Sequence, residues 1–343
     1  MESWLPEGPA ARWLYYLLTF ALAAVLAWIV TPRVRVAAIR FGIVDRPDGR
    51  LKTHREPVPY LGGLALYLSF LVALAATFSF SDEVLGILLA GSIVVILGLV
   101  DDLGQLGPWT KLGGQLVAIL VLIKSGIHIK LILLPMPVAI ILSVVWLLAV
   151  TNAFNLIDIM DGLSAGTAMI AALILLVVAE LNGGSATGTL LAALAGSCFG
   201  FLRYNFEPAR IYMGDTGSMF LGLSLGALAM DNAYTERNIV GALAPALILG
   251  VPLFDMLFVM YIRWKRGLPV MLGSPDHVAL RLRRWRLSTA QTVLGSYAAT
   301  GMLGGAAVAM TLLPIGGAIA ALSLVLLVGL LLALLLKRID MGL

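Results

Sequence analysis

The chain has 343 residues, of which 60% are hydrophobic and only 12% are charged, and its formal net charge is +4. This composition is too apolar for a soluble globular protein, and repeated runs of roughly 18 to 20 apolar residues are typical of helices that cross a lipid bilayer. The small net charge gives no support to nucleic-acid binding. We therefore predict an all-α integral membrane protein that forms a single polytopic domain over residues 1–343.

The apolar runs predict about eleven transmembrane helices. The first run is long enough to span the bilayer, and we expect it to be a membrane helix rather than a cleaved signal peptide. Pro252 predicts a kink in the ninth span. The predicted spans are residues 12–31, 60–79, 84–101, 110–126, 137–154, 164–181, 186–203, 216–231, 239–262, 289–311 and 315–336.

The placement of basic residues predicts how these helices are oriented. If the N-terminus lies outside, the outer connections carry only Arg12, Lys124, Lys130 and Arg237 of the 23 Lys and Arg residues. Lys and Arg gather in the cytoplasmic loops of membrane proteins. The sequence therefore predicts an N-out, C-in topology.

With this orientation, the conspicuous polar clusters share the cytoplasmic face. Ionisable residues at the edge of a membrane span are costly, and by default they mark a functional site. We therefore predict an active site on the cytoplasmic face. Its candidate polar residues at span ends are Asp101, Asp102, Asn152, Asn155, Asp158, Asp161 and Asp215.

Asp101 and Asp102 are adjacent carboxylates, which repel each other unless they share a proton or bind a cation. Neighbouring residues on a helix point about 100° apart, so the two need not contact the same ligand, and either could serve as metal ligand or base. Asp215, in "YMGDTGS", opens a helix whose N–H groups would attract phosphate while its carboxylate holds Mg²⁺. The alternative is that Asp215 only caps the helix.

Asn152, Asn155, Asp158 and Asp161 recur at every third position. On a continuing helix this spacing makes a slowly turning stripe of amides and carboxylates. Such a stripe would present donors and acceptors to a sugar nucleotide. The alternative is that the two acids cap the following span.

Two further inner loops carry basic residues and histidines. "VDRPDGRLKTHREPVPYLGG" contains Lys52 and His54, and "SPDHVALRLRRWRLS" contains His277 and Arg281. Arginines beside an inner leaflet commonly reflect orientation and attraction to anionic lipids, and this is the alternative for most of these arginines. His277 precedes the basic run, in a loop rich in Gly and Pro, and we expect it to contact a diphosphate.

The chain resembles the polyprenyl-phosphate N-acetylhexosamine-1-phosphate transferases of glycosyltransferase family 4. The resemblance covers essentially the whole chain and is carried by "VDRPDGRLKTHREPVPYLGG", "VDDLGQLGPWTKLGGQ", "NAFNLIDIMDGLSAG", "YNFEPARIYMGDTGS", "PLFDM" and "SPDHVALRL". It is closest to the branch that transfers N-acetylglucosamine 1-phosphate to undecaprenyl phosphate and starts O-antigen or teichoic acid synthesis. The phospho-N-acetylmuramoyl-pentapeptide transferases, whose last cytoplasmic loop carries a run of histidines, are more distant.

This resemblance implies transfer of a sugar 1-phosphate from a UDP-N-acetylhexosamine to a polyprenyl phosphate, with release of UMP. It implies Mg²⁺ as the cofactor, with Mn²⁺ as an alternative, and a multi-pass protein of the bacterial inner membrane. N-acetylglucosamine is the expected sugar because it is the commonest donor in this branch, while other N-acetylated hexoses and the polyprenyl length stay open. A homodimer is compatible with the resemblance.

The resemblance also implies roles for individual residues. Asp215 is the leading metal ligand, and Asp101 and Asp102 are further ligands. The catalytic residues are Asp101, Asp102, Asp158, Asp161 and His277. Tyr212 stacks on the uracil, and the full set of substrate-binding residues is Lys52, His54, Lys111, Asn152, Asn155, Asn205, Tyr212 and Arg281.

Two departures from the family pattern imply different sugar contacts. Ile159 stands where the second acidic motif often has glycine, and Ala279 and Leu280 stand where further histidines often follow His277. Besides the phospho-N-acetylmuramoyl-pentapeptide transferase, two other readings compete. A transporter would use the acids as a cation path, but transporters bind near the midplane and often show internal repeats, whereas these acids lie at one face. A catalytically silent scaffold is the third reading.

Overall fold

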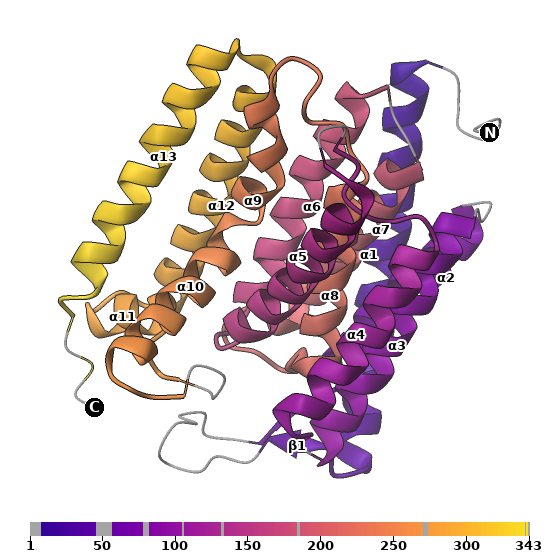
Figure 1. The fold of residues 1–343 in the computed structure, drawn as a ribbon. Helices are drawn as coiled ribbons and strands as arrows, with labels where there is room; N and C mark the ends of the chain where they lie inside the picture. Colours follow the sequence, from indigo (N-terminus) through magenta and orange to yellow (C-terminus); the bar gives the residue numbers. More distant parts are fainter. Residues whose placement is uncertain are drawn as a thin grey trace.

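Helices make up most of the chain in the computed structural model (Figure 1). The structure describes residues 8–45, 57–77, 82–104, 106–131, 134–183, 186–269, 274–339 and 341. Its helices are α1 (Pro9–Arg40), α2 (Gly62–Thr77), α3 (Asp82–Gly104), α4 (Pro108–Lys124), α5 (Met136–Ile157), α6 (Leu163–Leu181), α7 (Ala186–Asn205), α8 (Gly214–Met230), the 3₁₀ helix η1 (Ile239–Leu243), α9 (Ala244–Ile248), α10 (Gly250–Lys265), α11 (Val278–Arg284), α12 (Thr289–Leu312) and α13 (Ile315–Leu336). The strands are β1 (Val44–Asp45) and β2 (Val58–Pro59), which pair antiparallel.

The predicted all-α membrane fold is confirmed, and each predicted span coincides with a helix or a helix pair. Within the described residues, seven helices are long and apolar enough to cross a membrane, and counting the bent pair of residues 239–248 and 250–265 as one span gives eight. The other three of the eleven predicted spans correspond to the shorter helices α2, α4 and α8, which have 16, 17 and 17 residues. α1 begins and α13 ends at opposite ends of the bundle (Figure 1).

α8 lies inside the bundle and packs against α2, α3, α5 and α6. Every residue from Thr216 to Ala229 is buried, as expected for a helix without a polar face. The neighbouring backbones approach closely, since a Cβ on Gly63 of α2 would lie 2.1 Å from the backbone nitrogen of Gly217. Small residues at such crossings are the usual means of tight helix packing in membranes. The N-terminal end of α8 is therefore held firmly by its neighbours.

α1 continues past the predicted span to Arg40, although it contains Pro32. Proline has no N–H and leaves the carbonyl four residues earlier without its helical partner. Here that carbonyl belongs to Trp28, and the hydroxyl of Tyr204 in α7 donates to it at 3.1 Å. A side chain of a neighbouring helix thus compensates for the missing bond, as membrane helices require.

The ninth predicted span is not one continuous helix. Residues 239–248 and 250–265 meet at an angle of 78°. The break at Leu249 comes three residues before Pro252, whose missing N–H cannot bond to the carbonyl of Ile248. The predicted kink is confirmed, and it is sharp enough to separate α9 from α10.

Candidate active site

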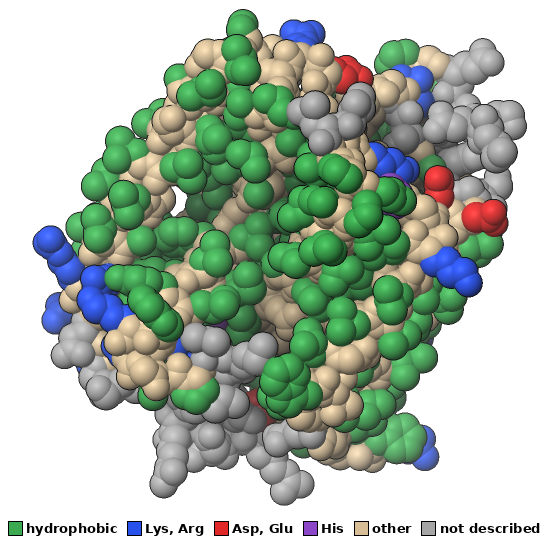
Figure 2. Space-filling view, in the orientation of Figure 1, with side chains coloured by type: hydrophobic (Ala, Val, Ile, Leu, Met, Phe, Trp, Pro, Cys, Tyr) green, Lys and Arg blue, Asp and Glu red, His purple; other side chains and the backbone are tan. Residues whose placement is uncertain are grey.

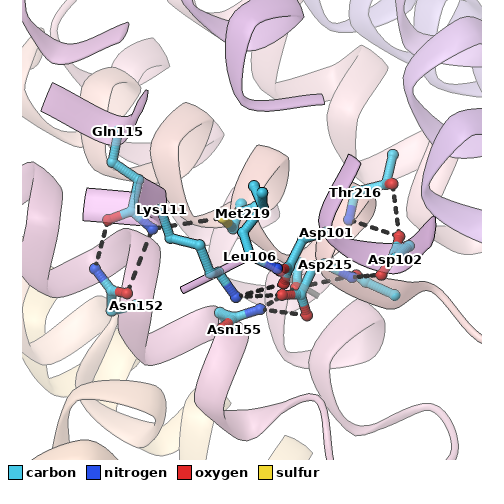
Figure 3. Close-up of polar contacts among 12 residues, drawn as sticks. Asp101, Asp102, Leu106, Lys111, Gln115, Asn152, Asn155, Asp215, Thr216 and Met219 are labelled. Atoms are coloured by element: carbon cyan, nitrogen blue, oxygen red, sulfur yellow. Dashed lines mark hydrogen bonds and ion pairs between the residues drawn. The ribbon is translucent and has the colours of Figure 1, made fainter. Parts of the chain in front are cut away.

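Three helices bring one lysine between two carboxylates at one end of the bundle. Lys111, in the first turn of α4, places Nζ 2.9 Å from Oδ2 of Asp101 near the end of α3. The same ammonium donates to Asp215 in the first turn of α8. The side chains of Lys111, Asp101 and Asp215 are 20%, 12% and 29% exposed, so they are accessible but shielded from bulk water. Figure 3 shows both carboxylates at the Lys111 ammonium, and we name these three residues the Asp101–Lys111–Asp215 cluster.

The two adjacent aspartates have different partners. Asp101 accepts from the backbone N–H of Leu106 and from Lys111. Asp102 instead accepts from the N–H groups of Asp215, at 2.8 Å, and Thr216, at 3.1 Å, and from the Thr216 hydroxyl at 2.7 Å. Asp102 therefore caps α8 from a neighbouring helix. Both of its oxygens accept bonds from the first turn of α8, and its predicted role as a metal ligand stays a prediction.

The contact between α3 and α8 depends on two glycines. A Cβ on Gly98 would lie 2.5 Å from the Cα of Thr216. Gly214 has φ 72°, a conformation that favours glycine, and a Cβ there would lie 2.6 Å from Oδ2 of Asp102. A side chain at either position would separate Asp102 from the helix end that it caps.

Asn155 of α5 joins the Asp101–Lys111–Asp215 cluster, as predicted for a residue of the site. Its Nδ2 lies 2.9 Å from Oδ1 of Asp215 and 3.0 Å from Oγ of Ser218. Lys111 contacts the other oxygen of Asp215. The Asp215 carboxylate is thus fixed in orientation by donors from two helices.

Asn152, one helical turn before Asn155, contacts Gln115 instead of the cluster. Its Nδ2 donates to Oε1 of Gln115 and to the carbonyl of Leu148, both at 2.8 Å. Asn152 thus contributes to the packing of α5 against α4, and its predicted role in substrate binding stays a prediction. Gln115 did not stand out in the sequence, although it follows Lys111 by four residues and so shares its face of α4.

The predicted stripe of polar residues is wrong beyond Ile157, because α5 ends there. Asp161 accepts from the N–H of Ala209 at 2.8 Å. Asn205, which is 3% exposed, accepts from the N–H of Gly162 at 3.1 Å and donates to the carbonyl of Ile211 at 3.0 Å. These bonds fasten the turn after α5 to the segment that precedes α8. Asn205 thus positions that segment, and its predicted role in substrate binding stays a prediction.

Asp158 follows the last residue of α5 and interacts electrostatically with the other acidic residues. Desolvation, followed by the negative charges of Asp215, Asp102 and Asp161, raises the pKa of Asp158 well above its ordinary value. The carboxylates thus share a region with an excess of negative charge. A polyanionic substrate requires additional positive charge to bind there.

Tyr212 lies in the segment before α8 and is paired with Tyr60, which the sequence analysis did not single out. The backbone of Tyr212 donates to the carbonyl of Pro59 and accepts from the N–H of Gly62, both at 2.9 Å. The two tyrosine rings are 6.3 Å apart between centroids and inclined by 50°. Burial, followed by the charges of Asp161 and Asp45, raises the pKa of Tyr212 to about 12, so this phenol stays neutral.

His277 forms a separate pair with Asp255 of α10. Nδ1 of His277 lies 2.6 Å from Oδ2 of Asp255, and the N–H of Val278 donates to Oδ1 of Asp255 at 2.7 Å. The side chains of His277 and Asp255 are only 3% and 5% exposed. Asp255 therefore orients the ring of His277 and the start of α11 together, a role that no local sequence signal indicated.

Arg281 does not lie in an open substrate site. Its guanidinium donates to Asp276 Oδ1 at 2.6 Å and to the carbonyls of Leu336, at 3.1 Å, and Ile339, at 2.8 Å. The residue is 1% exposed. This side chain thus ties α11 to the end of α13, and its predicted substrate contact stays a prediction. The other two predicted substrate-binding residues of the inner loops, Lys52 and His54, lie outside the described residues.

The donor set of the cluster fits a divalent cation. Among the residues that the structure describes, no group of three or more His, Cys, Asp or Glu side chains is arranged to hold a metal ion. Mg²⁺ is, however, commonly held by one or two carboxylates, with phosphates and waters completing its octahedron. Asp101 and Asp215 already share one cation, the Lys111 ammonium, and their oxygens are the hard donors that Mg²⁺ prefers.

Comparison with known proteins identifies a family match and several relatives. The family model described as "Glycosyl transferase family 4" matches residues 84–233, a range that contains the whole Asp101–Lys111–Asp215 cluster. A protein of Bacillus subtilis (strain 168) named as a probable undecaprenyl-phosphate N-acetylglucosaminyl 1-phosphate transferase is 32% identical, over 83% of this chain and 82% of its own.

Two further relatives align with this chain over similar fractions of its length. The decaprenyl-phosphate N-acetylglucosaminephosphotransferase of Mycolicibacterium smegmatis is 33% identical, over 82% of this chain and 78% of its own. The phospho-N-acetylmuramoyl-pentapeptide-transferase of Heliobacterium modesticaldum is 31% identical, over 76% of this chain and 86% of its own. Given this identity across most of its length, the chain belongs to glycosyl transferase family 4.

Proposed function

We propose that the protein transfers N-acetylglucosamine 1-phosphate from UDP-N-acetylglucosamine to a polyprenyl phosphate, releases UMP and so starts the synthesis of a cell-envelope polysaccharide. The observation that carries this proposal is the Lys111 ammonium held between Asp101 and Asp215 at the end of the bundle. The names of the undecaprenyl- and decaprenyl-phosphate relatives support the choice of sugar and acceptor.

In this reaction an oxygen of the polyprenyl phosphate bonds to the β-phosphorus of the UDP-sugar. The bond from that phosphorus to the bridging oxygen breaks, and this oxygen leaves with UMP. Such transfers need positioning and charge neutralisation more than covalent participation by the protein. Lys111 supplies a positive charge that two carboxylates hold in place, and Asp102 keeps the N–H groups of α8 aligned beside them.

We propose Mg²⁺ as the cofactor, with Asp215 and Asp101 as its protein ligands and Mn²⁺ as an alternative ion. When bound, the ion would neutralise charge that develops on the phosphate oxygens during transfer. Asn155 fixes the orientation of Asp215. Burial and then the negative charges of Asp215, Asp102 and Asp161 raise the pKa of Asp158, and added positive charge would offset the contribution of those charges.

The remaining donor contacts are proposed for Tyr212 and His277. Tyr212, supported by the ring of Tyr60, is proposed to stack on the uracil. His277 is proposed to contact the donor diphosphate through Nε2, because Asp255 holds the other ring nitrogen. All of the residues proposed for the reaction come from one chain. The homodimer stays a prediction, and measuring the molecular mass of the protein in detergent would test it.

We further propose eleven membrane spans with the N-terminus outside and the cluster at the cytoplasmic surface. Trp109, Trp264 and Trp285 are all exposed, and they lie at the start of α4 and at the ends of α10 and α11. Figure 1 shows these helix ends at the end of the bundle where α3 ends. Exposed tryptophans of membrane proteins gather at the membrane–water interface. A Gly267→Cys variant, with the buried Cys198 changed to Ala, should react with a membrane-impermeant maleimide only from the cytoplasmic side. Labelling from the opposite side would overturn this topology.

The decisive experiment is UMP release by the purified protein in detergent. The assay contains undecaprenyl phosphate, Mg²⁺ and either UDP-N-acetylglucosamine, another UDP-N-acetylhexosamine or UDP-N-acetylmuramoyl-pentapeptide. The Asp215→Asn variant should lose at least about a hundredfold in rate, the effect of removing one charge-stabilising group from an active site. Asp82→Asn, an exposed change in the first turn of α3, is the matched control and should remain active.

The result identifies the donor as well as the reaction. Lipid-dependent UMP release with UDP-N-acetylglucosamine supports the proposal, and exclusive use of the pentapeptide donor would replace it with the peptidoglycan reaction. If folded protein that elutes as a single species releases no UMP with any of the donors, the result would count against a transferase.

A further inference from the structure

We propose that a groove between α10 and α13 binds one anionic phospholipid, with its phosphate at Lys265 and Lys337 and an acyl chain along the apolar wall. The groove has a volume of about 380 Å³. Its walls come from α10 and α13, whereas the Asp101–Lys111–Asp215 cluster is built by α3, α4 and α8.

The two walls are helical stripes with the same spacing. A residue and those three, four and seven positions later lie on one face of a helix. The wall from α10 consists of Phe254, Leu257, Phe258 and Tyr261. The wall from α13 consists of Leu330, Ala333, Leu334 and Lys337.

Both stripes change from apolar to polar at the same end. At 1.5 Å per residue each stripe is roughly 10 Å long, which suits the first part of an acyl chain. Tyr261 and Lys337 close the groove, and Nζ of Lys337 lies 3.5 Å from the Tyr261 hydroxyl and 5.7 Å from its ring centroid. The groove thus has the polarity of a phospholipid, with a charged end and an apolar length.

A second lysine adds positive charge at the polar end of the groove. The side chain of Lys265, at the end of α10, lies beside that of Lys337. Two neighbouring ammonium groups attract an anion more strongly than one does. Figure 2 shows Lys and Arg side chains gathered where α13 ends, below a surface of apolar side chains. A phosphate with an attached acyl chain complements both features.

The base of the groove is packed and does not have to form on binding. Phe258, Ile262 and Leu336 make a small buried cluster beneath it. The Arg281 guanidinium lies 5.4 Å from the centroid of the Phe258 ring and donates to the carbonyl of Leu336. These contacts fix the positions of the ends of α10 and α13 relative to each other.

The position of the groove favours a phospholipid over the polyprenyl phosphate acceptor. The acceptor must bring its phosphate to the cluster, whereas the lysine at the polar end of the groove, Lys337, does not belong to the cluster and would hold a different phosphate. Leu330 and Leu334 are 57% and 48% exposed on a helix that is buried only at Ala318 and Leu336. The stripe therefore faces the bilayer, where anionic lipids are attracted to lysines near the membrane surface.

The test uses a phosphatidylglycerol with a diazirine in its acyl chain, incorporated into nanodiscs of phosphatidylcholine that contain the full chain. After photolysis, crosslinked peptides are mapped by mass spectrometry. We expect peptides of α10 and α13 to be labelled. We also expect Lys265→Gln/Lys337→Gln to reduce that labelling at least about fivefold, the factor that one lysine near an anionic lipid provides.

Two further variants separate this site from general attraction and from misfolding. Arg40→Gln/Arg203→Gln removes two exposed charges from the same end of the bundle, away from the groove, and should leave labelling unchanged. Ala333→Trp keeps both lysines but fills the groove, and should reduce labelling as strongly as the double lysine variant.

Three results would overturn the proposal. The first is equal labelling by a phosphatidylcholine probe, and the second is undiminished labelling in the double lysine variant. The third is displacement of the probe by undecaprenyl phosphate at lower concentration than by unlabelled phosphatidylglycerol, which would assign the groove to the acceptor lipid.

Discussion

Asp102 of α3 and Thr216 of α8 are joined by two hydrogen bonds, from the Thr216 hydroxyl at 2.7 Å and from its N–H at 3.1 Å. Asp101, the residue immediately before Asp102, forms an ion pair with Lys111 instead. One step along α3 thus separates a carboxylate that caps a buried helix from one that lies in the charged cluster. The difference in partners predicts a difference in what each residue does.

Asp102→Ala should lower the free energy of unfolding by about 1–3 kcal/mol, because the N–H groups at the start of α8 lose their acceptor inside the bundle. The thermal midpoint in detergent measures this effect. Asp101→Ala should shift the midpoint less and abolish UMP release. Equal midpoints for the Asp102 variant and the unchanged protein would remove the capping role.

Replacing Tyr212 tests the proposed uracil contact. Tyr212→Ala should raise KM for the UDP-sugar about fivefold with little change in kcat, since an aromatic contact is worth roughly 1 kcal/mol. Tyr212→Phe keeps the ring and should retain the original KM. A normal KM for the alanine variant would show that the uracil binds elsewhere.

Asp158 should make the stability of the metal-free protein depend on pH. Its pKa is raised in the folded state, so its contribution to stability is complete below the ordinary value of 3.8 and is lost as pH rises through the raised pKa. The thermal midpoint in EDTA should therefore fall with rising pH above 3.8, and Asp158→Asn should weaken this dependence. A variant with the same pH profile as the unchanged protein would contradict the assignment.

Arg281→Met should destabilise the protein by about 3–5 kcal/mol, because Asp276 would be left as a buried carboxylate without its closest cation. The fraction that remains active should retain the original KM for the UDP-sugar. Arg283→Met, an exposed change in the same helix, is the control and should leave the midpoint unchanged. A stable Arg281 variant with a raised KM would instead support the predicted substrate contact.

The sequence predicted which residues gather at the site better than it predicted what each one contacts. Lys111, Asn155 and Asp215 lie together as expected, although they come from three helices. Asn152 and Asn205 were predicted from the same motifs, yet their amides bond within the protein. Amides and carboxylates serve packing as readily as substrate binding, so motif membership does not separate the two uses.

The sequence by itself determined that this is a helical membrane protein, where its apolar segments lie and which motifs carry its polar groups. These are properties of short stretches of chain, because the bilayer requires apolar runs of a given length. Only the tertiary structure decided that Asp101 faces Lys111 while Asp102 caps α8, and that Asp255 holds His277. The partner of a side chain depends on how helices distant in sequence cross, and those crossings are set by close approaches such as that of Gly98 to Thr216.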